Sequence, residues 1–109
     1  MTQTFENHGV HAATKTKTMA DDNNWQIPAA ELWSSGVENS GTRAVAVFVT
    51  VETNDARVAF GGADASAGTG HVFSSGDSFR ITGHANISAM KIANATAGSN
   101  TKIIYTVEF

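Results

Sequence analysis

The sequence of 109 residues contains no cysteine and only one proline. Without cysteine, the chain forms no disulfide, holds no metal through thiolates and has no cysteine nucleophile. Small secreted domains usually depend on disulfides, and the first residues lack the basic and apolar stretches of a signal peptide, so secretion is not the expected route. No apolar run approaches the roughly 18 residues of a membrane span, so no membrane partner is expected.

Charged residues are also scarce. They make up 16% of the chain, against about 25% in an average globular domain. Seven Lys and Arg stand against ten Asp and Glu, which gives a net charge of −3. Such a chain has no basic surface for neutralising phosphates, so nucleic-acid binding is not expected. The length suits one domain with one modest core.

Short segments with alternating apolar residues make up most of the chain. The clearest covers residues 43–52, where every second residue from Val45 to Val51 is valine and the other face is small, which predicts a central strand. Residues 57–60 follow after a short turn and predict a hairpin with it. Residues 101–109 alternate in the same way, with Glu108 on the face opposite Tyr105.

These segments predict an all-β protein. We expect a single antiparallel β-sandwich, Ig-like or jelly-roll, of about seven or eight short strands over residues 25–109. No segment repeats apolar residues with helical spacing over three turns, and residues 87–93 are interpreted as a strand. The predicted buried residues are Val47, Val49, Phe60, Phe79, Ile81, Ile92, Tyr105 and Val107.

Residues 1–24 form a segment of different character, with few large apolar side chains. Threonine and lysine alternate from Thr14 to Thr18, which predicts an edge strand near residues 13–20. Because this segment cannot bury enough surface by itself, we predict an extended arm that a neighbouring chain orders through main-chain hydrogen bonds; a partly disordered leader is the alternative. The predicted partner-binding residues of the arm are Phe5, Val10, Thr14, Lys15, Thr16, Lys17 and Thr18.

The segment from Trp25 to Trp33 allows two interpretations. Pro28 either begins a short helix or lies on a sheet edge, and we favour a strand followed by a turn. The two tryptophans fill the core, or they form a stacking platform for a sugar or an anchor in a partner's pocket.

No motif of the sequence predicts catalysis. The run Gly76-Asp77-Ser78 is similar to the start of a GDSL-type hydrolase block, but no Asp follows Asp77 and His84 lies only six residues beyond Ser78, so a turn is the better interpretation. The glycine-rich run 61–70 lacks the lysine of a phosphate-binding loop. The four histidines, His8, His11, His71 and His84, do not have the spacing of a metal site. We therefore expect no enzyme activity, no cofactor and no metal.

Several blocks together resemble a known group of proteins. They are residues 47–53, 57–62, 70–71, 76–79 and 86–92, followed by the alternating C-terminal run. In this combination, residues 43–109 are similar to small β-sandwich proteins encoded among the virion genes of tailed bacteriophages and prophages. Head decoration, or cementing, is a recurrent role in that group.

The resemblance implies a structural role. It leads us to expect a capsid decoration protein that is made in the host cytoplasm and lies in the virion, on the capsid surface, where it stabilises the head. The expected partners are the major capsid protein and further copies of the chain, with a homotrimer favoured by the quasi-three-fold sites of the lattice. The alternatives are a neck, tail or baseplate component, and a carbohydrate-binding module that contacts the host surface.

Overall fold

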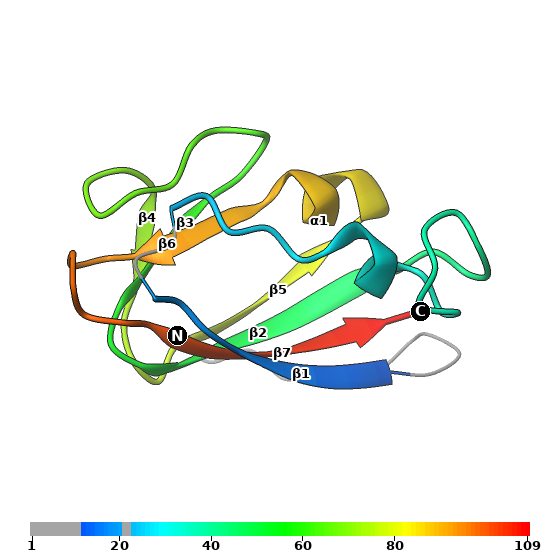
Figure 1. Cartoon of the computed structure of the whole chain (residues 1–109), viewed down its shortest axis with the longest axis horizontal. Helices are drawn as coiled ribbons and strands as arrows, with labels where there is room; N and C mark the ends of the chain where they lie inside the picture. Colours follow the sequence, from blue (N-terminus) through cyan, green and yellow to red (C-terminus); the bar gives the residue numbers. More distant parts are fainter. Residues whose placement is uncertain (1–11, 21–22) are drawn as a thin grey trace.

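The computed structural model describes residues 12–20 and 23–109, and it arranges them as two antiparallel sheets in two layers (Figure 1). The prediction of an all-β sandwich is confirmed. In chain order the elements are β1 (Ala12–Thr18), the 3₁₀ helix η1 (Ala29–Leu32), β2 (Ala46–Thr53), β3 (Ala56–Ala59), β4 (His71–Phe73), β5 (Ser78–Thr82), the helix α1 (His84–Ala89), β6 (Lys91–Asn94) and β7 (Lys102–Glu108).

The larger sheet has the order β1-β7-β2-β5, and the smaller sheet has the order β4-β3-β6. The valine-rich strand β2 therefore lies inside the larger sheet, as its two uncharged faces predicted. Its inward residues Val47, Val49 and Val51 are completely buried. The C-terminal strand β7 is also internal, because β1 covers its other edge.

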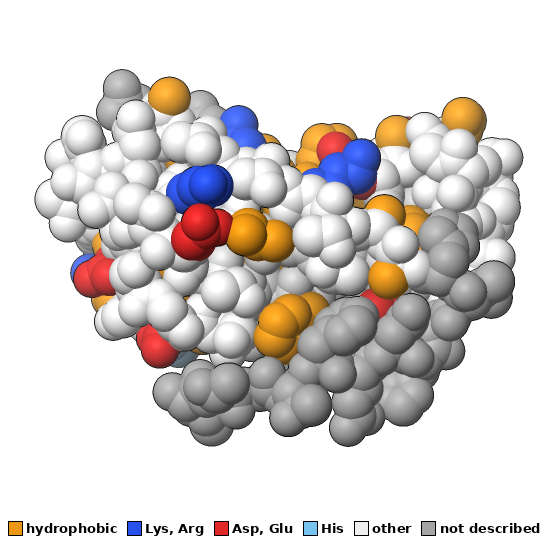
Figure 2. All heavy atoms as spheres, turned by 90° about the horizontal axis from the view of Figure 1, so that it is seen from below, with side chains coloured by type: hydrophobic (Ala, Val, Ile, Leu, Met, Phe, Trp, Pro, Cys, Tyr) orange, Lys and Arg blue, Asp and Glu red, His pale blue; other side chains and the backbone are white. Residues whose placement is uncertain are grey.

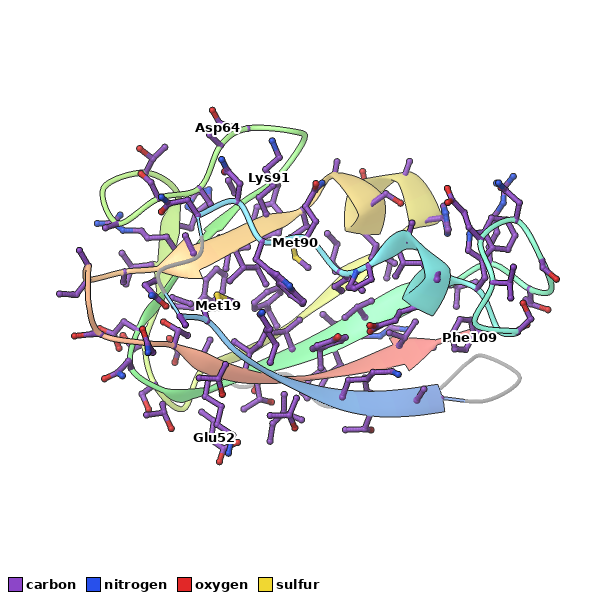
Figure 3. All side chains as sticks on the ribbon, viewed as in Figure 1. Met19, Glu52, Asp64, Met90, Lys91 and Phe109 are labelled. Carbon is purple, nitrogen blue, oxygen red and sulfur yellow. The ribbon has the colours of Figure 1, made fainter. Side chains whose placement is uncertain are left out.

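The core fills the space between the two sheets. Figure 3 shows Met19 and Met90 in this space, and both side chains are at most 1% exposed. Burying one large apolar side chain contributes about 1.5–3 kcal/mol, so this single cluster supplies most of the favourable free energy of folding. Its largest fully buried apolar members are Met19, Leu32, Ile87, Met90, Ile92, Ile103, Val47, Val49, Val51, Val58 and Val107.

The predicted hairpin between residues 43–52 and 57–60 is wrong. β2 and β3 follow one another in the chain, but they belong to different sheets. The register of β2 against β7 shifts between Val51 and Thr53, and Asn54 then takes a left-handed conformation with φ of 60°. This bulge and turn lead the chain from one layer into the other, whereas a hairpin would have kept both strands in one sheet.

The prediction for residues 87–93 is partly wrong, because this region begins inside a helix. α1 covers His84–Ala89 and only then does β6 begin. Six residues are too few to show helical periodicity, and Ile87 is the only residue of this helix that is buried. The preference for strand and turn in residues 25–33 is also wrong in part, since η1 follows Pro28, as the helical alternative proposed.

Two predicted core residues are less buried than expected. Phe60 lies just beyond the end of β3 and is 39% exposed, with its ring edge-on to Phe79 at 6.2 Å. Ile81 is half-buried on the edge strand β5. Both residues lie at the margins of the two layers rather than in the space between the sheets. Val45 precedes β2 and is likewise exposed, although it continues the valine alternation.

Candidate functional site

β1 is the outer strand of the larger sheet, and its pairing with β7 determines which of its backbone groups are open. In an antiparallel ladder, pairs that exchange backbone hydrogen bonds alternate with pairs that do not. The N–H of Met19 donates to the carbonyl of Thr101 at 2.8 Å, in continuation of the β1–β7 register. Every odd-numbered residue of β1 therefore bonds to β7. The backbone groups that point away from the sheet belong to the residues between them, Thr14, Thr16 and Thr18.

The two faces of β1 have different chemistry. Thr14 lies opposite Thr106 on the outer face of the sheet, where their hydroxyl oxygens are 2.9 Å apart. Lys15 and Lys17 lie on the inner face, opposite Tyr105 and Ile103. The Nζ atom of Lys17 is 5.9 Å from the centre of the Trp25 ring, in cation–π contact. The alternation seen in the sequence thus separates hydroxyls from ammonium groups.

The predicted edge strand is confirmed, but its partner in this structure differs from the expected one. We expected Thr14 to Thr18 to pair with another chain, whereas all seven residues of β1 pair with β7 of the same chain. The expected arm of residues 1–24 thus contains a strand of the larger sheet. The pairing continues through Met19, which is completely buried, so that the strand is anchored by the core. The predicted anchors Phe5 and Val10 lie outside the described residues.

The two tryptophans have different environments. Trp25 is half-buried, exchanges two backbone hydrogen bonds of 2.9 Å with Ile92 of β6, and packs on Tyr105 at 5.6 Å between ring centres. It therefore joins the two layers along the side where β1 lies. Trp33 is also half-buried; Arg43 lies 5.8 Å from its ring centre, and His84 meets it edge-on at 5.3 Å.

A groove lies between the inner face of β1 and the segment that contains η1. Its volume is about 320 Å³. Trp33 and Phe109 give it an apolar part, and Lys15 and Glu31 bring one charge of each sign. The remaining lining residues are small: Ala13, Ala30, Ser34, Ser35 and Gly36.

Glu31 is fixed by a buried tyrosine. The hydroxyl of Tyr105 donates to the Glu31 carboxylate at 2.7 Å, and Tyr105 itself is only 3% exposed. Burial, followed by the hydrogen bond to Glu31 and its negative charge, raises the pKa of Tyr105 far above its ordinary value. The hydroxyl therefore remains protonated at neutral pH and acts as a donor. The sequence offered no signal for this contact, since the two residues are separated by 74 positions.

A second pocket of about 280 Å³ lies where the segment before and within η1 approaches α1. It is lined mainly by apolar and small residues, and the side-chain amide of Gln26 closes one side by donating to the carbonyl of Ser88 at 2.8 Å. No charged side chain lines it.

The turn interpretation of residues 76–78 is supported by the geometry. The Asp77 carboxylate accepts a hydrogen bond of 2.8 Å from the N–H of Ser74, and Gly76 has a left-handed φ of 97°. Ser78 begins the edge strand β5. Within residues 12–20 and 23–109, no three His, Cys, Asp or Glu side chains are grouped as a metal site would require. His8 and His11 lie outside that part of the chain.

The charged side chains of the described surface are few and dispersed. Figure 2 views the molecule from below the larger sheet, and the described part of this face consists mostly of uncharged polar side chains and backbone. In the opposite layer, Lys91 and Asp64 form an ion pair at 3.2 Å (Figure 3). None of the helices in the described part of the chain is long and apolar enough to cross a membrane.

Comparison with protein-family models and with curated proteins gives no match for this chain.

Proposed function

We propose that this chain is a structural protein of a bacteriophage virion, bound to the outside of the head as a decoration or cement protein. The observation that carries the proposal is the edge of β1, where the backbone groups of three threonines point away from the sheet. An extended segment of a partner adds to such an edge through main-chain hydrogen bonds. The partner proposed here is the major capsid protein, and the site of action is the capsid surface.

The remainder of the molecule is suited to a passive, repeated role. The described part of the chain has two packed layers with a large core between them and a surface with few charges, which favours close contact between many neighbouring copies. Because the copies on one particle act together, each contact needs only modest affinity. We propose a homotrimer, which matches the quasi-three-fold positions of an icosahedral lattice.

A carbohydrate-binding module is the second candidate. The groove beside β1 places Trp33 next to a carboxylate and two serines, and aromatic faces with nearby hydrogen-bonding groups are the usual means of holding a sugar. Arg43 and His84 already contact the Trp33 ring, which reduces the surface left for stacking. Quenching of tryptophan fluorescence by host-surface glycans, abolished in Trp33→Ala, would favour this candidate.

The decoration proposal is tested by two variants of one residue. The N–H of Thr16 points away from β7, so Thr16→Pro removes an outward donor without removing a hydrogen bond of the sheet. Thr16→Ala removes the side chain and leaves the backbone intact. We expect Thr16→Pro to lose binding to purified capsids and Thr16→Ala to bind like the original chain. Equal binding by both variants would mean that the β1 edge is not the attachment element.

Copy number separates the head from other parts of the particle. Quantitative mass spectrometry of purified particles, with the major capsid protein as the standard, is expected to find hundreds of copies of this chain. Tens of copies or fewer would place it in the neck, tail or baseplate instead.

A further inference from the structure

The lysines of β1 lie on the inner face of the strand. Lys15 and Lys17 are opposite Tyr105 and Ile103, which are both buried, so they occupy the side of the sheet that faces the core. Charges that point inward on an edge strand are a known device against uncontrolled pairing of edges. The edge of β1 therefore carries open main-chain groups together with inward-facing positive charge.

This charge disfavours a second copy of the same strand. Two copies of β1 pair about a two-fold axis when Thr16 of one lies opposite Thr14, Thr16 or Thr18 of the other. These three registers place Lys15 against Lys15, Lys15 against Lys17, or Lys17 against Lys17. Like charges directly opposite one another destabilise a strand pair. Self-pairing through β1 is thus opposed in each of its central registers.

The same charge favours an acidic segment. Lys15 is exposed and forms no ion pair with any residue of the described part of the chain. An added strand would place a side chain directly opposite Lys15, within the range of cross-strand pairing. The neighbouring inward side chain of that strand would lie opposite Ala13, beside the groove that Trp33 and Phe109 line. Trp33 and Phe109 favour an apolar group there, and the negative charge of Glu31 disfavours a second acidic one.

We infer that the β1 edge accepts an extended segment of a different protein, with an acidic residue facing Lys15 and an apolar residue over the groove, and that it rejects a second copy of itself. The inference rests on the proposed function in one respect only, namely that the edge binds a partner chain. It adds the chemistry of that partner's segment. It also implies that the proposed homotrimer is assembled through other surfaces.

Two short capped peptides test the partner's chemistry with the purified protein alone. In the first, threonine alternates with inward-facing residues, of which the one facing Lys15 is glutamate and the next is leucine; in the second, lysine replaces the glutamate. Hydrogen exchange followed by NMR reports on the N–H groups of Thr14, Thr16 and Thr18. We expect the glutamate peptide to protect these groups, with an affinity about tenfold higher than that of the lysine peptide.

The variant Lys15→Glu should reverse this preference, whereas Lys91→Glu, which changes the same charge on β6, should not. Failure of both peptides to protect the three N–H groups would show that the edge of β1 does not accept an added strand. Equal protection by both peptides, or an unchanged preference in Lys15→Glu, would show that the lysine does not select the partner. Each of these results overturns the inference.

Self-association gives a second test. The double variant with Lys15→Thr and Lys17→Thr should associate through β1, with protection of the Thr16 N–H that increases with protein concentration. The double variant with Lys91→Thr and Lys102→Thr loses the same charge elsewhere and should behave like the original chain. If the β1 variant shows no such protection, the lysines are not what prevents β1 from pairing with a second copy of itself.

The outcomes for this inference and for the proposed function are distinguishable. A preference for the acidic peptide together with the absence of the chain from phage particles would overturn the decoration role alone. Loss of capsid binding in Thr16→Pro, without any peptide preference, would support the decoration role and overturn the inference about charge.

Discussion

The guanidinium of Arg80 on β5 donates two hydrogen bonds to the carboxylate of Glu108 on β7, although β2 lies between these strands. The distances are 3.1 Å from Nε and 3.3 Å from Nη2. The Glu108 side chain has no exposed surface, while that of Arg80 is 22% exposed. The pair therefore links an edge strand to the interior of the sheet across the central strand.

Removal of Arg80 is predicted to be costly. Arg80→Gln leaves the buried Glu108 carboxylate without its guanidinium partner, and breaking a buried pair from one side typically destabilises by roughly 3 kcal/mol or more. Lys102→Gln is the control, since the pair of Lys102 with Glu52 spans 3.5 Å and both side chains are about two-fifths exposed. It should cost less than about 1 kcal/mol. Urea denaturation measures both values, and equal losses would contradict the prediction.

Tyr105 is predicted to make the folded protein less stable at alkaline pH. Its pKa is raised in the folded protein, so the unfolded chain ionises first, above the ordinary tyrosine pKa of about 10. The stabilisation is complete below that pH and is lost as the pH rises toward the folded pKa. The melting temperature should fall above pH of about 10 more steeply than in Tyr105→Phe.

The same residue offers a direct readout. Tyr105 is the only tyrosine of the chain, so the ultraviolet absorbance of tyrosinate follows this hydroxyl alone. In the folded protein the hydroxyl should titrate at a pH well above that of free tyrosine. In urea, where the chain is unfolded, its pKa should return to the ordinary tyrosine value. In Glu31→Gln the pKa should fall only in part, because burial is the largest cause of its rise. An ordinary titration of the folded chain would contradict this assignment.

Two phenylalanines that contact each other are predicted to differ in importance. Phe79 is 6% exposed and contacts Phe73 at 4.5 Å between ring centres, whereas Phe60 is 39% exposed. Phe79→Ala should cost about 3–5 kcal/mol, because it leaves a cavity between the layers. Phe60→Ala should cost clearly less, since much of its ring is already in water. Thermal melts of both variants test this order.

The part of the N-terminal segment that precedes β1 is predicted to matter less for folding than β1 itself. Deletion of residues 1–11 retains every described strand and should leave a folded sandwich. Deletion of residues 1–20 also removes β1 and the fully buried Met19, which uncovers the edge of β7 and opens the core. We expect the longer deletion to melt at a distinctly lower temperature or to aggregate. Equal melting temperatures would show that β1 contributes little to the sandwich.

Local patterns were enough to predict the strands that carry a strong alternation. Residues 43–52 and 101–109 show it because one side of each strand packs on the core, and a side chain's face follows from its position alone. The edge position of residues 14–18 was also predictable, because threonine and lysine tolerate a half-solvated strand.

The tertiary structure alone determined which strands pair and what the edge presents. The bulge at Val51–Thr53 sends β3 into the other layer, and no local pattern distinguishes this from a hairpin. The contact between Glu31 and Tyr105 joins residues 74 positions apart, and the inward direction of Lys15 depends on the register with β7. Alternation establishes that two faces exist, but only the packing of the layers determines which of them faces the core.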